Sequence, residues 1–456
     1  MMGMGRRARE RQGEFWVATG SLPNVPQHIF YDKLNAILAD GDFDDFVEEL
    51  CEPFYADNIG RPGIPPGVYF RMLFVGYFEG IDSQRGIAWR CADSRSLAQF
   101  LGYGQNEATP DHSSLTRIRD RLPLEIHEQV FACVLSLADD HQLLAGKTVA
   151  VDSTYLEANA AMKSIVRKET GEDWKEYVRR LAAEEGIDID NDEDLRKYDK
   201  NRSGKKVPNA EWESATDGDA RIAKMKDSRT HLAYKAEHTI DLESEFILDA
   251  SVYHADEADS ATLLTSIEAA QHNLFEAQVY RELEEVVADK GYHKNETLAD
   301  CRRWNYWGLR TYIPEPDSQF ERRWTDKPPE QKEAVYANRR RMSGNRGQRL
   351  QKKRSEFVER SFAHVCETGG ARRTWLRGLE KINKRYNIHV AAHNLGLLMR
   401  KLFGIGKPRC LQGGSVLIDL CQFAKTTIQN VLSRIWNMST PRQQKIHRIP
   451  PVAKAV

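Results

Sequence analysis

The sequence predicts an α/β protein in which an all-α N-terminal domain precedes a mixed sheet with flanking helices. Residues 1–140 carry helical patterns throughout. From residue 147 to residue 403, strand patterns and helix patterns alternate, and two of the strands are short Val-rich runs typical of strands buried on both faces. A highly charged stretch at about 163–220 is predicted to be a partly helical insertion.

Three segments of the N-terminal region have helical character. Residues 65–79 are apolar and aromatic, and residues 87–101 form an amphipathic pattern. Residues 111–122 begin with Asp111, a residue type that caps helices, and carry Arg117 and Arg119. This last helix is either the second helix of a helix-turn-helix that enters a DNA groove or a capped helix with exposed arginines.

The remaining elements follow in a recognisable order. They are a strand at 147–152, a helix at 174–185 within the insertion, a hairpin of 232–240 and 245–253, a helix at 257–275, a strand ending at Asp289, a helix at 295–304, a strand at 307–313 and helices at 350–365 and 386–403. Strand, hairpin, helix, strand, helix, strand, helix is the order of a ribonuclease H-like sheet. In that topology the strands that carry Asp152 and Asp289 are neighbours. We therefore expect a catalytic domain at 147–403, followed at 404–456 by a C-terminal helix (416–436) and a disordered tail.

The charges of the chain are strongly segregated, although its formal net charge is only −1. Residues 339–409 contain 19 Lys and Arg against 4 Asp and Glu, while seven of the eleven residues at 184–194 are acidic. Such segregation favours one surface that binds a polyanion, and a solvated basic helix is the alternative.

Nothing in the sequence indicates a membrane or secreted protein. No apolar stretch approaches the roughly 20 residues that span a bilayer. No apolar segment follows the N-terminal arginines, so no secretory signal is expected. The seven cysteines are scattered without metal-ligand spacing, which is typical of a reduced protein. We therefore expect a cytoplasmic protein that joins the nucleoid when it is bound to DNA.

Carboxylates are the candidate catalytic groups. Asp152 and Asp289 follow strands predicted to be neighbours, and ligands bind at the carboxyl ends of such strands. Glu359, from the helix at 350–365, would complete a set of hard oxygen ligands suited to Mg²⁺ or Mn²⁺. Glu356, one helical turn earlier, is the rival third carboxylate.

Four stretches of the chain resemble bacterial insertion-sequence transposases of the DDE class. They are Pro110–Ser113 with Arg117–Arg119, Val151–Thr154 with Glu157–Ala160, Ala288–His293, and Val358–Phe362 with Gly378–Leu379 and Asn394–Leu395 downstream. Related transposases often surround the glutamate with a tyrosine, an arginine and a lysine. Lys352, Ser355 and Cys366 stand at those positions here, and this departure weakens the assignment of Glu359.

The resemblance implies two metal ions about 4 Å apart, held by Asp152, Asp289 and Glu359. They would support cutting of double-stranded DNA at the element ends and joining to target DNA, by a homodimer or higher oligomer. Tyr292 and His293 would support the site. DNA contacts are expected from Arg117, Arg119, Arg339, Arg340, Arg341, Arg346, Arg349, Lys352, Lys353, Arg354 and Arg360. The competing hypotheses are a DNA-binding protein that no longer cuts and a standalone ribonuclease H-like nuclease.

Overall fold

The described part of the N-terminal region contains seven α-helices in the computed structural model. The model describes residues 28–55, 63–104, 106–189, 191–202, 209–225, 228–304, 308–317 and 322–408, so the predicted helix at 416–436 lies outside it. The helices are α1 (Ile29–Asp40), α2 (Phe43–Cys51), α3 (Pro66–Glu79), α4 (Gln84–Asp93), α5 (Arg95–Phe100), α6 (His112–Arg121) and α7 (Leu124–Asp140). α3 is buried on all sides from Pro66 to Phe78, which explains its uniformly apolar sequence.

The prediction of a single helix at 87–101 is wrong, because the helix is interrupted at Ser94, between α4 and α5. The Ser94 hydroxyl accepts a hydrogen bond from the Leu97 amide at 3.4 Å and so begins a new helix. The helix expected at 111–122 is confirmed as α6, and Asp111 caps it through the Ser113 amide at 2.8 Å.

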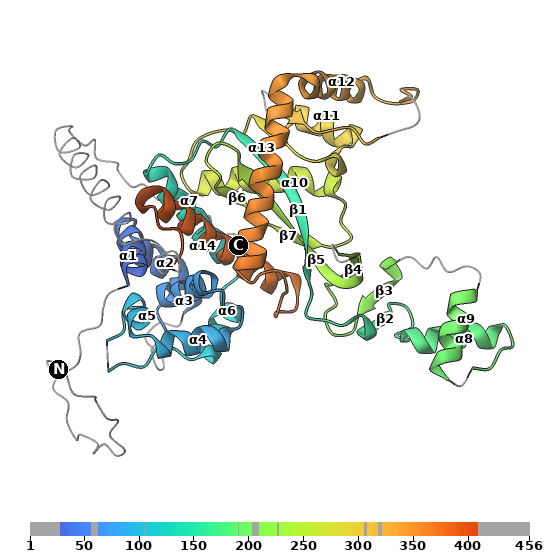
Figure 1. Cartoon of the computed structure of the whole chain (residues 1–456), viewed down its shortest axis with the longest axis horizontal. Coiled ribbons are helices and arrows are strands. Elements are labelled where there is room, and N and C mark those ends of the chain that lie inside the picture. The colour runs from blue at the N-terminus through green and yellow to red at the C-terminus, as the bar shows by residue number, and fades with distance from the viewer. Residues whose placement is uncertain are drawn as a thin grey trace, which may run out of the picture. The chain divides into compact units, whose positions relative to one another are not determined.

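A mixed sheet follows the helical region along the chain (Figure 1). Its strands are β1 (Thr148–Glu157), β4 (Arg221–Lys224), β5 (Thr230–Asp241), β6 (Ile247–Asp249), β7 (Val252–His254), β8 (Glu285–Val287) and β9 (Arg310–Tyr312). They are arranged β4-β5-β1-β8-β9, with β6 and β7 also paired to β5. β1 pairs antiparallel with β5 and parallel with β8, and β8 pairs parallel with β9. The prediction that the two aspartate-bearing strands are neighbours is confirmed.

Helices cover both faces of this sheet. Successive side chains of a strand point to opposite faces. Glu237 of β5 contacts Ser266 of α10 (Asp259–Glu276) at 2.6 Å. Its neighbour His238 contacts Ser361 of α13 (Asn345–Phe362) at 2.9 Å and Tyr386 of α14 (Leu379–Phe403) at 2.8 Å. α10 therefore covers one face, and α13 and α14 cover the other.

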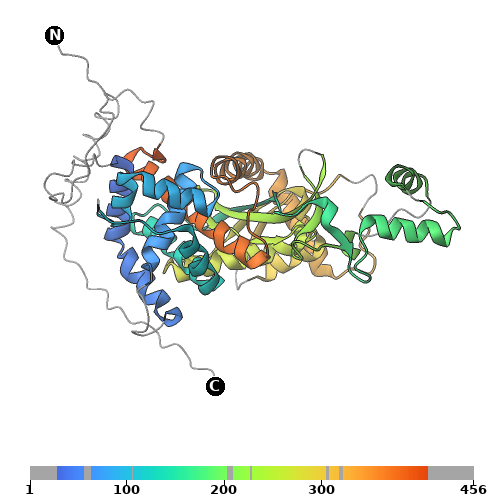
Figure 2. The same ribbon diagram turned by 90° about the horizontal axis from the view of Figure 1, so that it is seen from below.

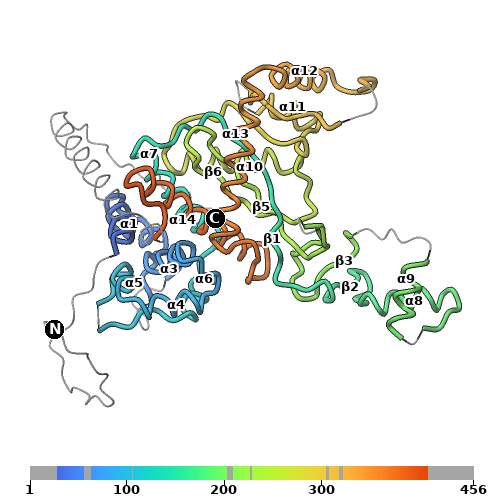
Figure 3. Tube along the Cα trace, in the orientation of Figure 1, coloured from blue at the N-terminus to red at the C-terminus, as the bar shows by residue number. Residues whose placement is uncertain are grey.

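The charged insertion folds around a small core of its own. It contains β2 (Ile165–Arg167), α8 (Trp174–Glu184), α9 (Asp192–Asn201) and β3 (Trp212–Ser214), all of which are labelled in Figure 3. α8 and α9 pack against each other (Figure 2), and Tyr177, Val178, Leu195 and Trp212 form the core. α9 was not predicted, since its sequence is mostly charged and only Leu195 is buried.

The basic stretch that begins at Arg339 is helical apart from a sharp junction at Gly344. The basic stretch forms α12 (Pro329–Ser343) and α13, which meet at Gly344, while Gly347 lies in the first turn of α13. A Cβ atom on Gly347 would lie 2.5 Å from the Arg341 carbonyl oxygen, so glycine allows the two helices to approach closely. α11 (Asn295–Arg303) packs against α12.

The chain divides into two compact units, residues 1–395 and 396–456. All the strands, and all the site residues discussed below, belong to the first unit. No helix within the described ranges is long and apolar enough to cross a membrane.

Candidate active site

Asp152 lies within β1 rather than at its end, which corrects the predicted strand boundary of 147–152. β1 continues to Glu157 because β5 pairs with it over nine positions, from Val149 to Glu157. Asp152 is opposite His238 in this register, so its side chain points to the face covered by α13. There its Oδ2 atom accepts a hydrogen bond from Arg354 at 2.6 Å, and its Oδ1 atom accepts one from the Ser153 amide at 2.9 Å.

Asp289 lies two residues beyond the end of β8, at the start of a tight turn. Its Oδ1 atom accepts a hydrogen bond from the Gly291 amide at 2.8 Å, which fixes the turn. A Cβ atom on Gly291 would lie 2.9 Å from Oδ2 of Asp259 and 3.0 Å from Oδ1 of Asp289. Glycine is therefore required here because two carboxylates approach its α-carbon from different elements.

The two predicted aspartates line a common cavity of about 620 Å³. Asp259, Glu367 and Arg372 line it as well. Burial raises the pKa of Asp152; the charge of Arg354 opposes this shift, and the negative charge of Asp289 adds to it. The cavity thus concentrates carboxylates where β1 continues beyond the end of β8. One of these carboxylates, Asp152, is already hydrogen-bonded to the Arg354 guanidinium.

Glu359 is not among the residues that line this cavity. Arg354 faces the sheet, and Glu359 is five residues further along the helix, which turns it about 140° away at 100° per residue. Its side chain is exposed on the same side of α13 as Lys352. The rival Glu356 is also exposed and pairs with Arg360. Within the described ranges, no three His, Cys, Asp or Glu side chains are grouped closely enough to hold a metal ion.

Glu367 reaches the cavity instead, and sequence reasoning missed it. α13 continues into a π-helical segment, Ala363–Thr368, which changes the direction of the side chains. Glu367 accepts hydrogen bonds from Arg372 at 2.9 and 2.7 Å. The hydrophobic period of an α-helix cannot reveal a π-helical turn, so the pattern offered no signal for this residue.

Tyr292 and His293 lie behind the site and are both buried. The Tyr292 hydroxyl donates to Glu237 Oε2 at 2.9 Å, which connects the turn after Asp289 to the central strand β5. Burial raises the pKa of both Tyr292 and Glu237. The ring nitrogens of His293 find no hydrogen-bond partner among the described residues, and burial lowers its pKa. Neither residue lines the cavity.

The predicted DNA-binding residues fall into three groups. Some are bound within the protein: Arg339 to Glu315, Arg341 to Thr311, Arg346 to Glu285, Arg354 to Asp152 and Arg360 to Glu245. Lys353 lies over the Phe357 ring, with its Nζ atom 5.2 Å from the centroid. Others are exposed and form no ion pair within the described ranges, and these are Arg117, Arg340, Arg349 and Lys352.

Arg119 was expected to contact DNA, but the structure buries it. Its side chain packs toward the core, with the whole residue only 8% exposed, and its guanidinium contacts Asp120 at 3.3 Å. Ile118 and Leu115 occupy the same buried side of α6, so the helix presents Arg117 rather than Arg119 to solvent.

Two family models match the chain. The transposase domain DUF772 matches residues 22–121, and a transposase DDE domain matches residues 317–399. Together the two matches support a DDE-class transposase of an insertion sequence. The second match covers α12, α13, the π-helical segment and most of α14, and so includes both Glu359 and Glu367. No curated protein and no solved structure matches the chain.

Proposed function

We propose that this transposase cuts DNA at the ends of its own insertion sequence and joins the freed 3′ ends to target DNA. The observation that carries the proposal is that Asp152 and Asp289, from adjacent parallel strands, line one cavity. The order of the strands, with an antiparallel partner on one side of β1 and two parallel strands on the other, supports a ribonuclease H-like catalytic domain at 147–403. The helical region at 1–140 would hold the element ends.

The donor set suits a divalent metal. Asp152 and Asp289 offer hard carboxylate oxygens in the cavity. Glu359 would be the third ligand once α13, whose Arg354 contacts Asp152, rotates to bring Glu359 from its exposed side into the cavity. Two Mg²⁺ or Mn²⁺ ions would neutralise charge on the attacking and leaving oxygens of the phosphodiester. The Arg354 guanidinium neutralises Asp152 in the metal-free protein, and in the metal-bound protein it would be available to a DNA phosphate.

Exposed cations on α12 and α13 support DNA as the ligand. Arg340, Arg349 and Lys352 are exposed and form no ion pair within the described ranges, so they are available to phosphates. Because an insertion sequence has two ends that are handled together, we propose that the transposase acts as a homodimer or higher oligomer on double-stranded DNA.

Substitution of Asp289 tests the proposal. Asp289→Asn should retain binding to an element-end duplex, because the amide keeps the size of the side chain, but should lose Mg²⁺-dependent cleavage. The matched control is Asp317→Asn, since Asp317 is 98% exposed and lies outside the cavity. Full cleavage by Asp289→Asn would exclude Asp289 as a metal ligand. A wild-type chain whose DNA product does not depend on divalent metal would instead indicate a DNA-binding protein that no longer cuts. Cleavage without preference for the element ends would indicate a standalone nuclease.

The third carboxylate is tested separately. We expect Glu359→Gln to abolish cleavage, while Glu367→Gln should reduce it only through loss of the contact with Arg372. The reverse order would assign the third ligand to Glu367, which lines the cavity.

A further inference from the structure

A short extended segment, residues 371–377, runs beside the end of β1 next to the catalytic cavity. Its sequence is Ala-Arg-Arg-Thr-Trp-Leu-Arg, and we name it the arginine–tryptophan strap. The Glu157 amide donates to the Arg372 carbonyl at 2.9 Å, and the Thr374 amide donates to the Glu157 carbonyl at 2.8 Å. These bonds fix the strap to β1, five residues beyond Asp152.

The side chains of the strap alternate between protein and solvent. Arg373, Trp375 and Arg377 are exposed, whereas Thr374 is buried and Leu376 is partly buried. Alternation is what an extended backbone produces, because successive side chains point to opposite sides. The strap therefore presents two cations and one large aromatic ring in a row on a single surface.

The strap begins in the cavity itself. Arg372 lines the cavity and donates to the Thr154 hydroxyl at 3.0 Å and to Glu367 at 2.7 Å. Thr154 lies two residues beyond Asp152 on the same strand and faces the same side. A DNA strand with a phosphate in the cavity would therefore lie next to the strap.

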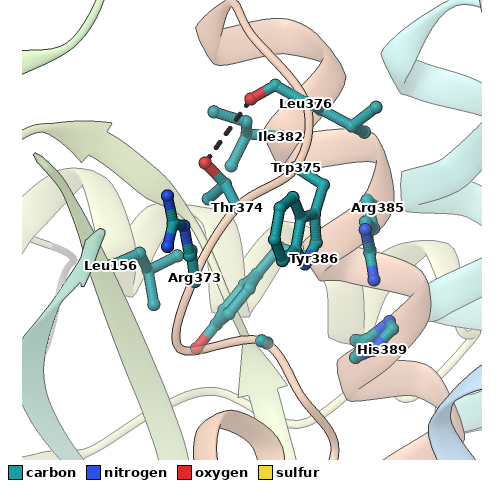
Figure 4. Close-up of a pocket in the computed structure, with 10 residues that line it drawn as sticks. Leu156, Arg373, Thr374, Trp375, Leu376, Ile382, Arg385, Tyr386 and His389 are labelled. Carbon is teal, nitrogen blue, oxygen red and sulfur yellow. Dashed lines mark hydrogen bonds between the residues drawn. The ribbon is translucent and has the colours of Figure 1, made fainter. Parts of the chain in front are cut away.

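The Trp375 ring is held in place although it is 46% exposed. Its Nε1 atom donates to Asp82, and the Arg373 guanidinium lies 5.1 Å from the ring centroid. In Figure 4, Trp375 lies among the side chains around a small pocket whose lining also includes Leu156, Ile382 and Tyr386. A ligand-binding role would explain why a large aromatic ring is fixed in place, exposed to solvent and flanked in sequence by two arginines.

We propose that the arginine–tryptophan strap binds an unpaired DNA strand beside the cavity, with a base stacked on Trp375 and phosphates on Arg373 and Arg377. This inference rests on the proposed function. Stacking on an aromatic side chain needs a free base face, which a duplex does not offer because its bases stack on each other. Arginine contacts to the backbone would add affinity without sequence preference.

Binding of the full-length chain to a fluorescent oligothymidylate tests the strap. An oligonucleotide of roughly 20 nucleotides exceeds the usual single-strand site, and EDTA prevents cleavage during the anisotropy measurement. Trp375→Ala should weaken binding about tenfold or more, and Trp375→Phe should keep most of the affinity. The control is Tyr280→Ala, which removes an aromatic side chain that is 78% exposed in the segment before β8 and should change nothing.

Two further measurements separate base stacking on Trp375 from general electrostatic attraction between the protein and DNA. Arg373→Gln should lower the slope of log affinity against log salt by about 0.7, the value for one phosphate contact with a single strand. Trp375→Ala should weaken duplex binding far less than single-strand binding. Unchanged single-strand affinity of Trp375→Ala, or an equal loss on duplex and single strand, would overturn the proposal.

The outcome is independent of cleavage. If the strap does not bind single strands but wild type cuts element ends with Mg²⁺, the proposed function stands and the strap proposal fails. If wild type does not cut and Trp375→Ala still weakens single-strand binding, the strap binds DNA in a protein whose proposed function is wrong.

Discussion

Arg354→Gln should destabilise the metal-free chain and make its stability more dependent on divalent metal. Arg354 contacts Asp152 at 2.6 Å, and their side chains are 13% and 27% exposed. Two unit charges about 4 Å apart attract by about 4 kcal/mol at an effective dielectric constant of 20. Partial exposure of the pair reduces this by roughly half, so removal of the guanidinium should lower the free energy of unfolding by about 2 kcal/mol.

The assay is urea unfolding at pH 7 with EDTA and again with excess Mn²⁺. In the variant, a metal ion can neutralise Asp152 without displacing a guanidinium, so Mn²⁺ should stabilise the variant more than it stabilises wild type. Arg360→Gln is the matched control on the same helix, because its partners Glu245 and Glu356 are 30% and 58% exposed and such pairs contribute less than about 1 kcal/mol. Equal stability of wild type and Arg354→Gln in EDTA, together with equal metal increments, would refute the reasoning.

Two more predictions concern the buried interior. Burial lowers the pKa of His238 to about 3, so the folded chain holds it neutral while the unfolded chain protonates it below about 6.5. Its contribution to stability is therefore complete above pH 6.5 and is lost as the pH falls, by about 2 kcal/mol at pH 5. Urea unfolding of His238→Gln should lack this part of the wild-type pH dependence, and identical slopes between pH 7 and 5 would contradict it. Gly369→Ala should cost about 1–3 kcal/mol, because its Cβ atom would lie 2.6 Å from the Val365 carbonyl oxygen and 2.8 Å from the Tyr77 ring. The thermal midpoint measures this loss, and Gly218→Ala, where nothing lies within 4 Å, should leave the midpoint unchanged.

The sequence predicted the parts of the fold that depend on periodic burial. The Val-rich runs of β1 and β8 were recognised because strands buried on both faces have few other compositions. α12 was missed because it buries little apolar surface. It is held by Asn338, which is fully buried and exchanges hydrogen bonds of 3.0 and 2.7 Å with the backbone of Ile313. A buried asparagine has no pattern in sequence.

The site was only partly predictable for a related reason. Strand adjacency was enough to bring Asp152 and Asp289 together, since both positions follow from the sheet. Which carboxylate reaches the cavity as the third one depends on the rotation of α13 about its axis and on how far the chain remains α-helical. The π-helical segment after α13 alters both, and places Glu367 where Glu359 was expected.

The contact between Asp152 and Arg354 also has a consequence for the timing of assembly. The two residues are 202 positions apart, so a ribosome adding 5–20 residues per second needs on the order of 10–40 seconds to supply the second after the first. During that interval β1 lacks the helix that covers its carboxylate. A polypeptide released before α13, by a frameshift or an early stop codon, lacks Arg354, Glu367 and Arg372 and so never completes the cavity.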